Sequence, residues 1–268
     1  MSGLVEFGIR CPRCRQGLLE RSEQGDARCG ACGACYPIEA GVVCLLAPSR
    51  EARTLAQAAM EWPLLIRIYE SRLWRRNPLF AMVTGISFDQ EYALINKALG
   101  LGEGDRLLDL ACGPGIYARR FARVVSQGVV VGLDLSAPML RYAQQKATAQ
   151  GLRNLLFVRG DAMALAFEEE CFDAVNCCGA LHLFPSATQA LSEIARVLRP
   201  KGRFSAAVFR RSEGEQAAQG TARQRAVSGV DAYSITQIGA LFEEAGLCDV
   251  TFLHKGARWL VVSAEKAG

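Results

Sequence analysis

Apolar residues follow two alternating patterns in the second half of the chain. From residue 104 onward, short apolar runs alternate with stretches in which apolar positions recur every three or four residues. The first pattern is typical of buried strands and the second of amphipathic helices. The predicted strands are 106–110, 129–134, 155–158, 174–178, 203–209, 250–254 and 258–264, and the predicted helices are 116–126, 136–150 and 187–198. Such alternation predicts an α/β fold with parallel strands and crossover helices.

Residues 51–100 carry helical spacing throughout, interrupted at Pro63, Pro78 and Gly85. We expect helices over 51–61, 64–75 and 88–99. Tyr69 and Tyr92 lie on the second and third of these predicted helices. Each side chain is suited either to closing over a bound ligand or to packing in the core. Further along the chain, Ser136 precedes a predicted helix, and two Ser-x-x-Gln pairs, at 186–189 and 234–237, have the spacing of a capping box.

Composition narrows the class of protein. Of the 268 residues, 50% are hydrophobic and 22% are charged, which excludes an intrinsically disordered chain. No apolar run approaches ~18 residues, and the first residues lack the layout of a signal peptide. We therefore expect a cytoplasmic protein without a membrane span. The net charge of +4 is too small to indicate a nucleic acid or membrane partner, and nothing in the sequence indicates the oligomeric state.

Cysteine usage is unusual. The chain has 11 cysteines, an odd number that argues against a disulfide framework, and six of them fall between residues 11 and 44. Cys11 and Cys14 form one Cys-x-x-Cys knuckle, and Cys29 and Cys32 form another. Two such knuckles supply four thiolates for a tetrahedral zinc ion, and a closed site of this kind is usually structural. Cys32 and Cys35 form a third, overlapping pair, but the symmetrical choice of ligands is Cys11, Cys14, Cys29 and Cys32.

The stretch from Cys29 through Tyr36, Pro37 and Gly41 to Leu46 resembles the small zinc-ribbon domains of the Trm112-like class. Those domains activate methyltransferases, either as separate subunits or as fused amino-terminal modules. The resemblance leaves Cys35 outside the ligand set. It implies a zinc-ribbon module over residues 1–48.

A glycine-rich loop follows the first predicted strand of the second half. It reads Asp109-x-Ala111-x-Gly113-x-Gly115 and leads into a helix whose free N–H groups face the loop. Asp134 ends the next strand, 19 residues after Gly115, where a carboxylate is suited to grip the two hydroxyls of a ribose. Asp161 ends the turn after the third strand, within reach of an adenine amine.

The loop alone also fits a relaxed dinucleotide fingerprint. Three features favour another cofactor. Asp109 stands where a dinucleotide-binding strand is normally apolar, Gly160-Asp161-Ala162 has the form of an adenine-binding turn, and the chain ends in two strands close enough to form a hairpin at the sheet's edge.

Residues from about 60 to 268 resemble class I S-adenosylmethionine-dependent methyltransferases. The matching segments are 108–115, 132–140, 160–162, 172–175, 180–182 and 193–202. The family usually has glycine where Ala111 stands. The resemblance implies a Rossmann-like sheet of seven strands, six parallel and one antiparallel at the edge, over residues 101–268. It implies that residues 49–100 cap the cofactor. The combination with a cysteine ribbon is similar to plant-plastid and bacterial methyltransferase-like proteins and to zinc-bearing ribosomal RNA guanine-N1 methyltransferases.

The resemblance also implies which residues bind the cofactor. Asp109 would orient its amino-acid end, Asp134 would hold the ribose, and Met139 and Ala162 would flank the adenine. The full predicted set is Asp109, Ala111, Cys112, Gly113, Gly115, Asp134, Leu135, Met139, Asp161, Ala162 and Asn176.

The acceptor side is less well defined by the sequence. Asn176, Cys177 and Cys178 end the fourth strand, facing the expected transfer point, but no Asn-Pro-Pro-Tyr box or Pro-Cys nucleophile is present. His182 is a candidate general base, although packing is the more common role for a histidine there. A small, fairly apolar acceptor is favoured, with residues 212–233 as a mobile lid.

Two alternatives to a small acceptor remain open. RNA is one, because Arg72, Arg75 and Arg76 lie close together and zinc ribbons often touch nucleic acid. However, residues 1–50 hold six basic and five acidic residues, too even a balance to grip phosphates. The other alternative is a non-catalytic protein whose ribbon docks a partner.

Overall fold

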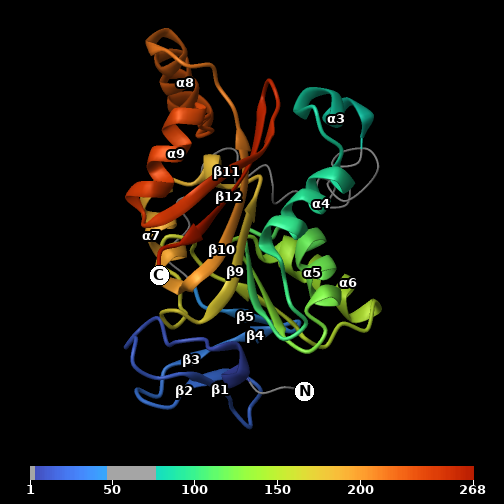
Figure 1. Ribbon diagram of the computed structural model, residues 1–268. Helices are drawn as coiled ribbons and strands as arrows, with labels where there is room; N and C mark the ends of the chain where they lie inside the picture. Colours follow the sequence, from blue (N-terminus) through green and yellow to red (C-terminus); the bar gives the residue numbers. More distant parts are fainter. Residues whose placement is uncertain (1–3, 47–76) are drawn as a thin grey trace.

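The computed structural model describes residues 4–46 and 77–268. At its centre is a nine-stranded sheet with the strand order β11-β12-β10-β9-β6-β7-β8-β5-β4. Helices cover both faces, α4, α5 and α6 on one and α7 and α9 on the other (Figure 1). The strands of this sheet are β4 (Ile38–Glu39), β5 (Val42–Cys44), β6 (Arg106–Leu110), β7 (Val129–Asp134), β8 (Leu155–Arg159), β9 (Phe172–Cys178), β10 (Leu198–Phe209), β11 (Leu247–Lys255) and β12 (Trp259–Lys266).

The described residues form seven α-helices, five of which cover the sheet (Figure 1). They are α3 (Pro78–Thr84), α4 (Phe88–Leu99), α5 (Ile116–Val124), α6 (Ala137–Ala149), α7 (Ala187–Val197), α8 (Glu215–Ser228) and α9 (Ile235–Glu244), with a 3₁₀ turn, η2, at Leu181–Leu183. Ser136, Ser186 and Ser234 each accept a hydrogen bond from the backbone N–H three residues later, which confirms the predicted starts of α6, α7 and α9.

The seven predicted strands are all present, and β8, β7, β6, β9 and β10 run parallel as expected. The antiparallel strand, however, is not at the edge. β12 lies between β10 and β11 and pairs antiparallel with both. Only residues 256–258 separate β11 from β12, so the two strands must form an antiparallel hairpin. β12 is its inner strand, and β11 becomes the edge.

The sheet has nine strands rather than seven because β4 and β5 extend it beyond β8. β5 pairs parallel with β8, placing Val43 opposite Val158, and β4 pairs antiparallel with β5. Val42, Val43 and Cys44 are all buried. This pairing covers the edge of β8, which would otherwise expose unpaired backbone groups. Residues 38–44, expected in the ribbon segment 1–48, therefore belong to the central sheet.

The remainder of the amino-terminal segment forms a small separate sheet. The strands of this sheet are antiparallel and are β1 (Leu19–Arg21), β2 (Ala27–Cys29) and β3 (Cys35–Tyr36). A short 3₁₀ helix, η1 (Leu4–Phe7), precedes them. Arg106, the first residue of β6, donates to the Glu6 carbonyl, and Ile9 forms a β-bridge with Phe167. The small sheet thus packs at the amino ends of the parallel strands, away from the glycine loop that follows β6 (Figure 1).

Most of residues 212–233, which the sequence suggested as a mobile lid, form helix α8, and the role as a lid stays a prediction. The alanines, glutamines and arginines of this stretch have high helix propensity, which a reading based on its small and polar residues overlooked. The predicted helices 51–61 and 64–75, with Tyr69, Arg72, Arg75 and Arg76, lie outside the described residues. No helix formed by residues 4–46 and 77–268 is long and apolar enough to span a membrane.

Candidate functional site

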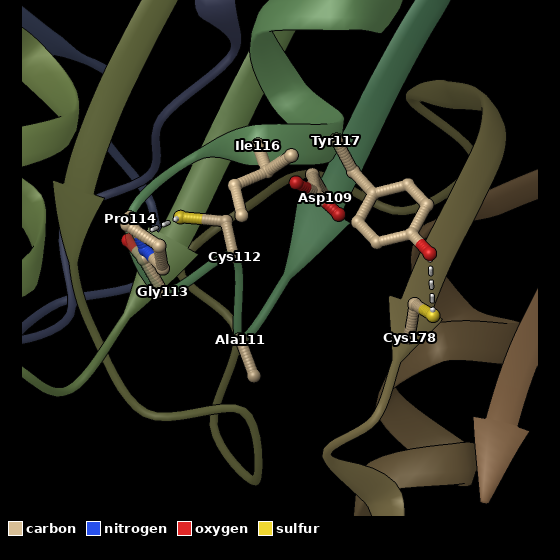
Figure 2. A pocket seen from close by; sticks show the side chains of 8 residues that line it. All are labelled: Asp109, Ala111, Cys112, Gly113, Pro114, Ile116, Tyr117 and Cys178. Atoms are coloured by element: carbon tan, nitrogen blue, oxygen red, sulfur yellow. Dashed lines mark hydrogen bonds between the residues drawn. The ribbon is translucent and has the colours of Figure 1, made fainter. Parts of the chain in front are cut away.

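A small cavity lies where the glycine loop passes from β6 to α5, between the carboxyl ends of β6 and β9. Its volume is about 30 Å³, and Figure 2 shows the lining side chains. They come from the loop, from the first turn of α5 and from the end of β9, and they are Asp109, Ala111, Cys112, Gly113, Pro114, Ile116, Tyr117 and Cys178. Four of the predicted cofactor residues are thereby brought to one place.

The loop is held in an unusual backbone conformation. Ala111 has a φ of +54°, a left-handed value that is costly for a residue with a Cβ. Gly115, at the helix start, cannot be replaced without movement, since a Cβ there would lie 2.9 Å from the Phe157 ring and 3.0 Å from Ala143. The loop therefore packs tightly against β8 and α6 on one side and leaves its backbone open to the cavity on the other.

Asp134 connects the loop to the next strand–helix turn. Its Oδ2 accepts a hydrogen bond of 2.8 Å from the Gly113 N–H, and its Oδ1 accepts one of 2.8 Å from the Ser136 N–H. A carboxylate oxygen has more than one lone-pair site, so both oxygens keep capacity for a ligand's hydroxyl groups. This is the arrangement expected of a ribose-binding acid at the end of the second strand.

Three polar side chains form a buried row across β6, β9 and β10. Asn176 donates from Nδ2 to Asp109 Oδ1 at 2.7 Å, and Ser205 donates to Asn176 Oδ1 at 2.9 Å. Asp109 is 2% exposed and Asn176 is fully buried. Burial raises the pKa of Asp109 to about 7, an effect opposed by the hydrogen bond from Asn176. Asn176 was predicted to contact the cofactor. In the structure its hydrogen bond holds the Asp109 carboxylate in place.

The second oxygen of Asp109, Oδ2, is buried and has no hydrogen-bond partner among the described residues. A buried acceptor left in this state is costly, and a donor supplied by a ligand would relieve that cost. Asp109 also lines the cavity. Both observations fit a ligand carrying an ammonium group at this point.

The residues expected around an adenine lie on the neighbouring turns. Met139 is buried in the first turn of α6, and Ala162 is buried beyond β8. Asp161 accepts a hydrogen bond of 2.9 Å from the Met163 N–H through Oδ1, which fixes its turn. Leu135 is 40% exposed, directly after Asp134, and is free to cover a ring bound there.

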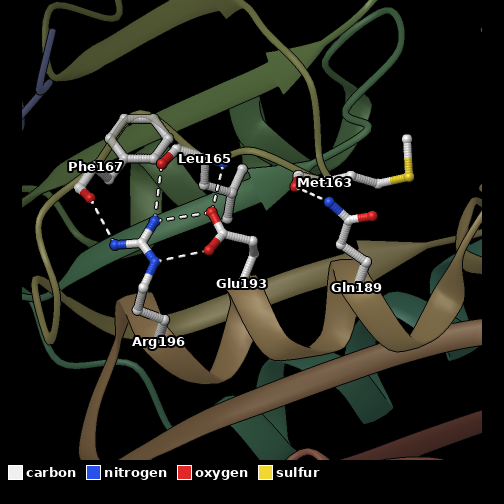
Figure 3. A network of polar contacts seen from close by, with 6 residues as sticks. All are labelled: Met163, Leu165, Phe167, Gln189, Glu193 and Arg196. Carbon is white, nitrogen blue, oxygen red and sulfur yellow. Dashed lines mark hydrogen bonds and ion pairs between the residues drawn. The ribbon is translucent and has the colours of Figure 1, made fainter. Parts of the chain in front are cut away.

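A second polar network holds the segment that follows this turn (Figure 3). Glu193 and Arg196 of α7 form an ion pair of 2.8 Å. Arg196 also donates to the carbonyl groups of Leu165 and Phe167, and Glu193 accepts from the Leu165 N–H at 2.7 Å. Glu193 and Arg196 do not line the cavity. Their network positions the backbone that leads away from Asp161.

An aromatic cluster lies beyond the carboxyl end of β9. His182 is 3% exposed, with its ring centroid 4.4 Å from that of Phe209 and 6.0 Å from that of Trp259. This placement suits packing, and a catalytic role for His182 stays a prediction. Burial raises the pKa values of the Cys112 and Cys177 thiols. Both thiols therefore stay protonated near neutral pH, which makes them poor nucleophiles.

The sequence did not point to a group of polar residues beside the cavity. Glu91 of α4 is 2% exposed and accepts hydrogen bonds from the Tyr117 hydroxyl and from Trp259 Nε1. Cys178 lies 3.2 Å from the Tyr117 hydroxyl and 3.3 Å from Glu91 Oε1. Only the spacing of α4, which turns Glu91 to the same side as Phe88 and Ile95, could have indicated burial of this carboxylate.

The two amino-terminal knuckles meet as predicted. The Sγ atoms of Cys11, Cys14, Cys29 and Cys32 all lie within 4.8 Å of one another. The Cys11–Cys32 and Cys14–Cys29 Sγ distances are 3.7 and 3.6 Å. A tetrahedral zinc ion with Zn–S bonds of ~2.3 Å would separate its sulfurs by about 3.8 Å. The four side chains therefore fit a zinc ion, and Cys35, which is exposed with its thiol directed to the Gly33 carbonyl, lies outside the group.

Local backbone features favour metal binding at this cluster. N–H groups of Gly17 and Gln16 stabilise the Cys14 thiolate and lower its pKa to about 6. Gly17 must be small, because a Cβ there would lie 2.6 Å from Cys29 Sγ and 2.8 Å from the Ala31 Cβ. The hairpin can thus close on the second knuckle only with glycine at this position.

Comparison with known proteins agrees with the geometry. Residues 107–202 match a family model described as a methyltransferase domain. An uncharacterised chloroplastic methyltransferase of Arabidopsis thaliana is 30% identical over 219 residues, which are 75% of this chain and 61% of the relative. A demethylmenaquinone methyltransferase of Lactiplantibacillus plantarum is 43% identical over 106 residues, 39% of this chain and 45% of the relative.

The fold has solved counterparts. The structure of Haemonchus contortus phosphoethanolamine N-methyltransferase 2 in complex with S-adenosyl-L-methionine superposes with a TM-score of 0.59 at 17% identity, covering 75% of this chain and 59% of that one. Residues 107–202 therefore match a methyltransferase domain, the fold is shared with solved structures of this kind, and the chain spans 61% of the length of the chloroplastic relative.

Proposed function

We propose that the protein transfers a methyl group from S-adenosylmethionine to a small, fairly apolar acceptor. The observation that carries the cofactor assignment is the position of Asp134 between the Gly113 and Ser136 N–H groups, beside the cavity of the glycine loop. Bound there, S-adenosylmethionine supplies a methyl group that is already activated, so the protein has mainly to bind and orient.

Each side chain then has a defined task. Asp134 accepts the ribose hydroxyls, Asp109 accepts the ammonium of the amino-acid end, and Asn176 holds Asp109 in place through its 2.7 Å hydrogen bond. Met139 and Ala162 enclose the adenine, with Asp161 near its amine. The loop from Ala111 to Pro114 lines the cavity and would contact the ligand there.

The apolar acceptor is supported by the carboxyl edge of the sheet. Phe209 and Trp259 flank His182 there. Helix α3, whose Thr84 carbonyl is 2.9 Å from His254 Nε2 of β11, exposes Met82 and Val83. Two relatives, a demethylmenaquinone methyltransferase and a fatty-acid O-methyltransferase of Mycolicibacterium smegmatis, are named after small, apolar acceptors.

The cysteine cluster is proposed as a structural zinc site. It sits at the amino ends of the strands, where Arg10 pairs with Glu168 at 2.8 Å, whereas the cavity lies beyond their carboxyl ends. A zinc ion there would stabilise the fold without reaching the transferred methyl group. Because of the same separation, the cysteine-containing segment is poorly placed to present RNA to the cofactor. An RNA acceptor is therefore only the second candidate.

The test is a transfer assay with S-adenosylmethionine labelled in its methyl group. Demethylated naphthoquinols, fatty acids and total RNA are offered in turn, and label is counted in the organic extract and in the RNA precipitate. We expect label in the organic extract, with little dependence on salt. The triple replacement Arg72→Ala, Arg75→Ala and Arg76→Ala should keep this activity. Label in RNA, together with RNA binding that vanishes between low and physiological salt, would overturn the small-acceptor assignment.

A further inference from the structure

A carboxylate lies one side chain behind the wall of the cofactor cavity. Tyr117 and Cys178 both line that cavity, and Figure 2 shows the Tyr117 hydroxyl turned toward Cys178. Glu91 accepts from the Tyr117 hydroxyl, and its Oε1 is 3.3 Å from Cys178 Sγ. The charge of Glu91 therefore stands beside the end of β9, on the side of the cavity opposite the glycine loop.

Fixing helix α4 does not require a carboxylate at this position. Phe88, Ile95 and Leu99 already bury the apolar face of α4. Glu91 is 2% exposed among them and is held from the other side by Trp259 Nε1 at 2.5 Å. Burying a carboxylate is costly, and an apolar residue of similar size would anchor the helix at lower cost. Hydrogen bonds donated by Tyr117 and Trp259 stabilise its negative charge.

We infer that Glu91 is a positioning residue that favours the positively charged methyl donor over its neutral product. The inference rests on the proposed function. In the transfer step the sulfur–methyl bond breaks, both its electrons stay on sulfur, and the methyl group bonds to the acceptor atom. The sulfonium thereby becomes a neutral thioether. A buried negative charge close to that sulfur attracts the donor and loses this attraction once transfer is complete.

The attraction is strong in such a place because a partly buried site screens charges poorly. At an effective dielectric constant of about 20, two unit charges interact about four times more strongly than in water. A tenfold change in affinity requires about 1.4 kcal/mol of such attraction. Glu91 would therefore help bind the donor and help release the product, S-adenosylhomocysteine.

The experiment measures the affinities of S-adenosylmethionine and S-adenosylhomocysteine by calorimetry on the full chain. Glu91→Gln keeps the size of the side chain and removes its charge. Its amide oxygen can still accept from Trp259 Nε1, and its amide NH2 can donate to the Tyr117 hydroxyl. It should weaken S-adenosylmethionine binding by about tenfold and leave S-adenosylhomocysteine binding nearly unchanged. Tyr117→Phe, which removes a hydrogen bond and keeps the charge, should leave the ratio of the two affinities close to that of the wild type.

Asp89→Asn is the matched control. Asp89 lies on the same helix with its side chain 70% exposed, paired with Arg120, so removal of its charge should alter neither affinity. If Glu91→Gln does not fold, Glu91→Asp, which draws the charge back by one methylene, should lower the ratio by about threefold. Equal weakening of both ligands, or an unchanged ratio, would overturn the inference. Absence of S-adenosylmethionine binding by the wild type would instead overturn the proposed function.

Discussion

At the scale of single residues, the site combines two unfavourable features. Ala111 is held at a positive φ, and Asp109 is buried with one oxygen lacking a partner. Features of this kind persist only where the surrounding structure enforces them, and they cluster at functional sites. Their consequences are measurable in the protein without any ligand.

Asp109 should make the stability of the free protein depend on pH. Its pKa is about 7 in the folded chain because of burial, whereas an unfolded aspartate titrates near ~4. The folded state therefore holds more protons between these values, and stability falls as the pH rises from about 4 to about 7. We expect Asp109→Asn to remove a loss on the order of 3 kcal/mol across this range, observed by denaturant unfolding at pH 5 and pH 8.

The same replacement should weaken S-adenosylmethionine binding, because the charge that receives the ammonium is gone. A wild-type protein whose stability does not change between pH 5 and pH 8 relative to Asp109→Asn would contradict the buried, protonated form of this carboxyl group.

Ala111→Gly should stabilise the fold. At a φ of +54° a Cβ costs about 1 kcal/mol, part of which the greater freedom of glycine in the unfolded chain offsets. We expect a gain of roughly 0.5–1 kcal/mol in thermal or denaturant unfolding. A clear loss of stability would show that the alanine methyl makes contacts worth more than the strain.

At the scale of elements, the sequence predicts best the helices and strands whose buried positions form a clear pattern along the chain. Strands β6 and β7 and helix α4 have the predicted bounds, because the two strands are continuous buried runs and the buried positions of α4 recur at helical spacing. The pairing of β5 with β8 could not be foreseen, since Val42 and Val43 suit the core of a ribbon as well as the edge of a sheet. Helix α8 was missed because its charged and small residues form no apolar stripe.

Gly17 should control metal binding by the two knuckles. Gly17→Ala places a methyl against Cys29 Sγ and Ala31, so we expect it to lower the zinc content of purified protein well below one ion per chain. Gly30→Ala is the control: it lies in the same hairpin region, and a Cβ there would meet nothing within 4 Å. Metal analysis by mass spectrometry compares the two.

Cysteine replacements extend this test. Cys29→Ser should lose the metal and loosen residues 4–46 in hydrogen exchange, while Cys35→Ser should keep it. Equal zinc content in Gly17→Ala and Gly30→Ala, or retention of zinc by Cys29→Ser, would show that the cluster is not the metal site.

At the scale of the whole molecule, the two candidate sites lie at opposite ends of one sheet. The cysteine cluster packs at the amino ends of the parallel strands, and the cavity opens at their carboxyl ends. The sequence motifs located Asp109, Gly113 and Asp134 at strand ends and turns that leave a sequence signature, and their role in cofactor binding stays a prediction. Glu91 and Trp259, 168 residues apart in the chain, meet in a hydrogen bond behind the cavity wall, and no local sequence pattern indicates such a long-range contact.

The central claim is that the cavity between β6 and β9 binds S-adenosylmethionine. Calorimetry with S-adenosylmethionine and NAD, on the wild type and on Asp134→Ala, tests it most directly. We predict that S-adenosylmethionine binds and NAD does not, and that Asp134→Ala weakens binding by about 1.5–3 kcal/mol through loss of the charged hydrogen bonds to the ribose. Tight binding of NAD, or an unchanged affinity for S-adenosylmethionine in Asp134→Ala, would contradict the assignment.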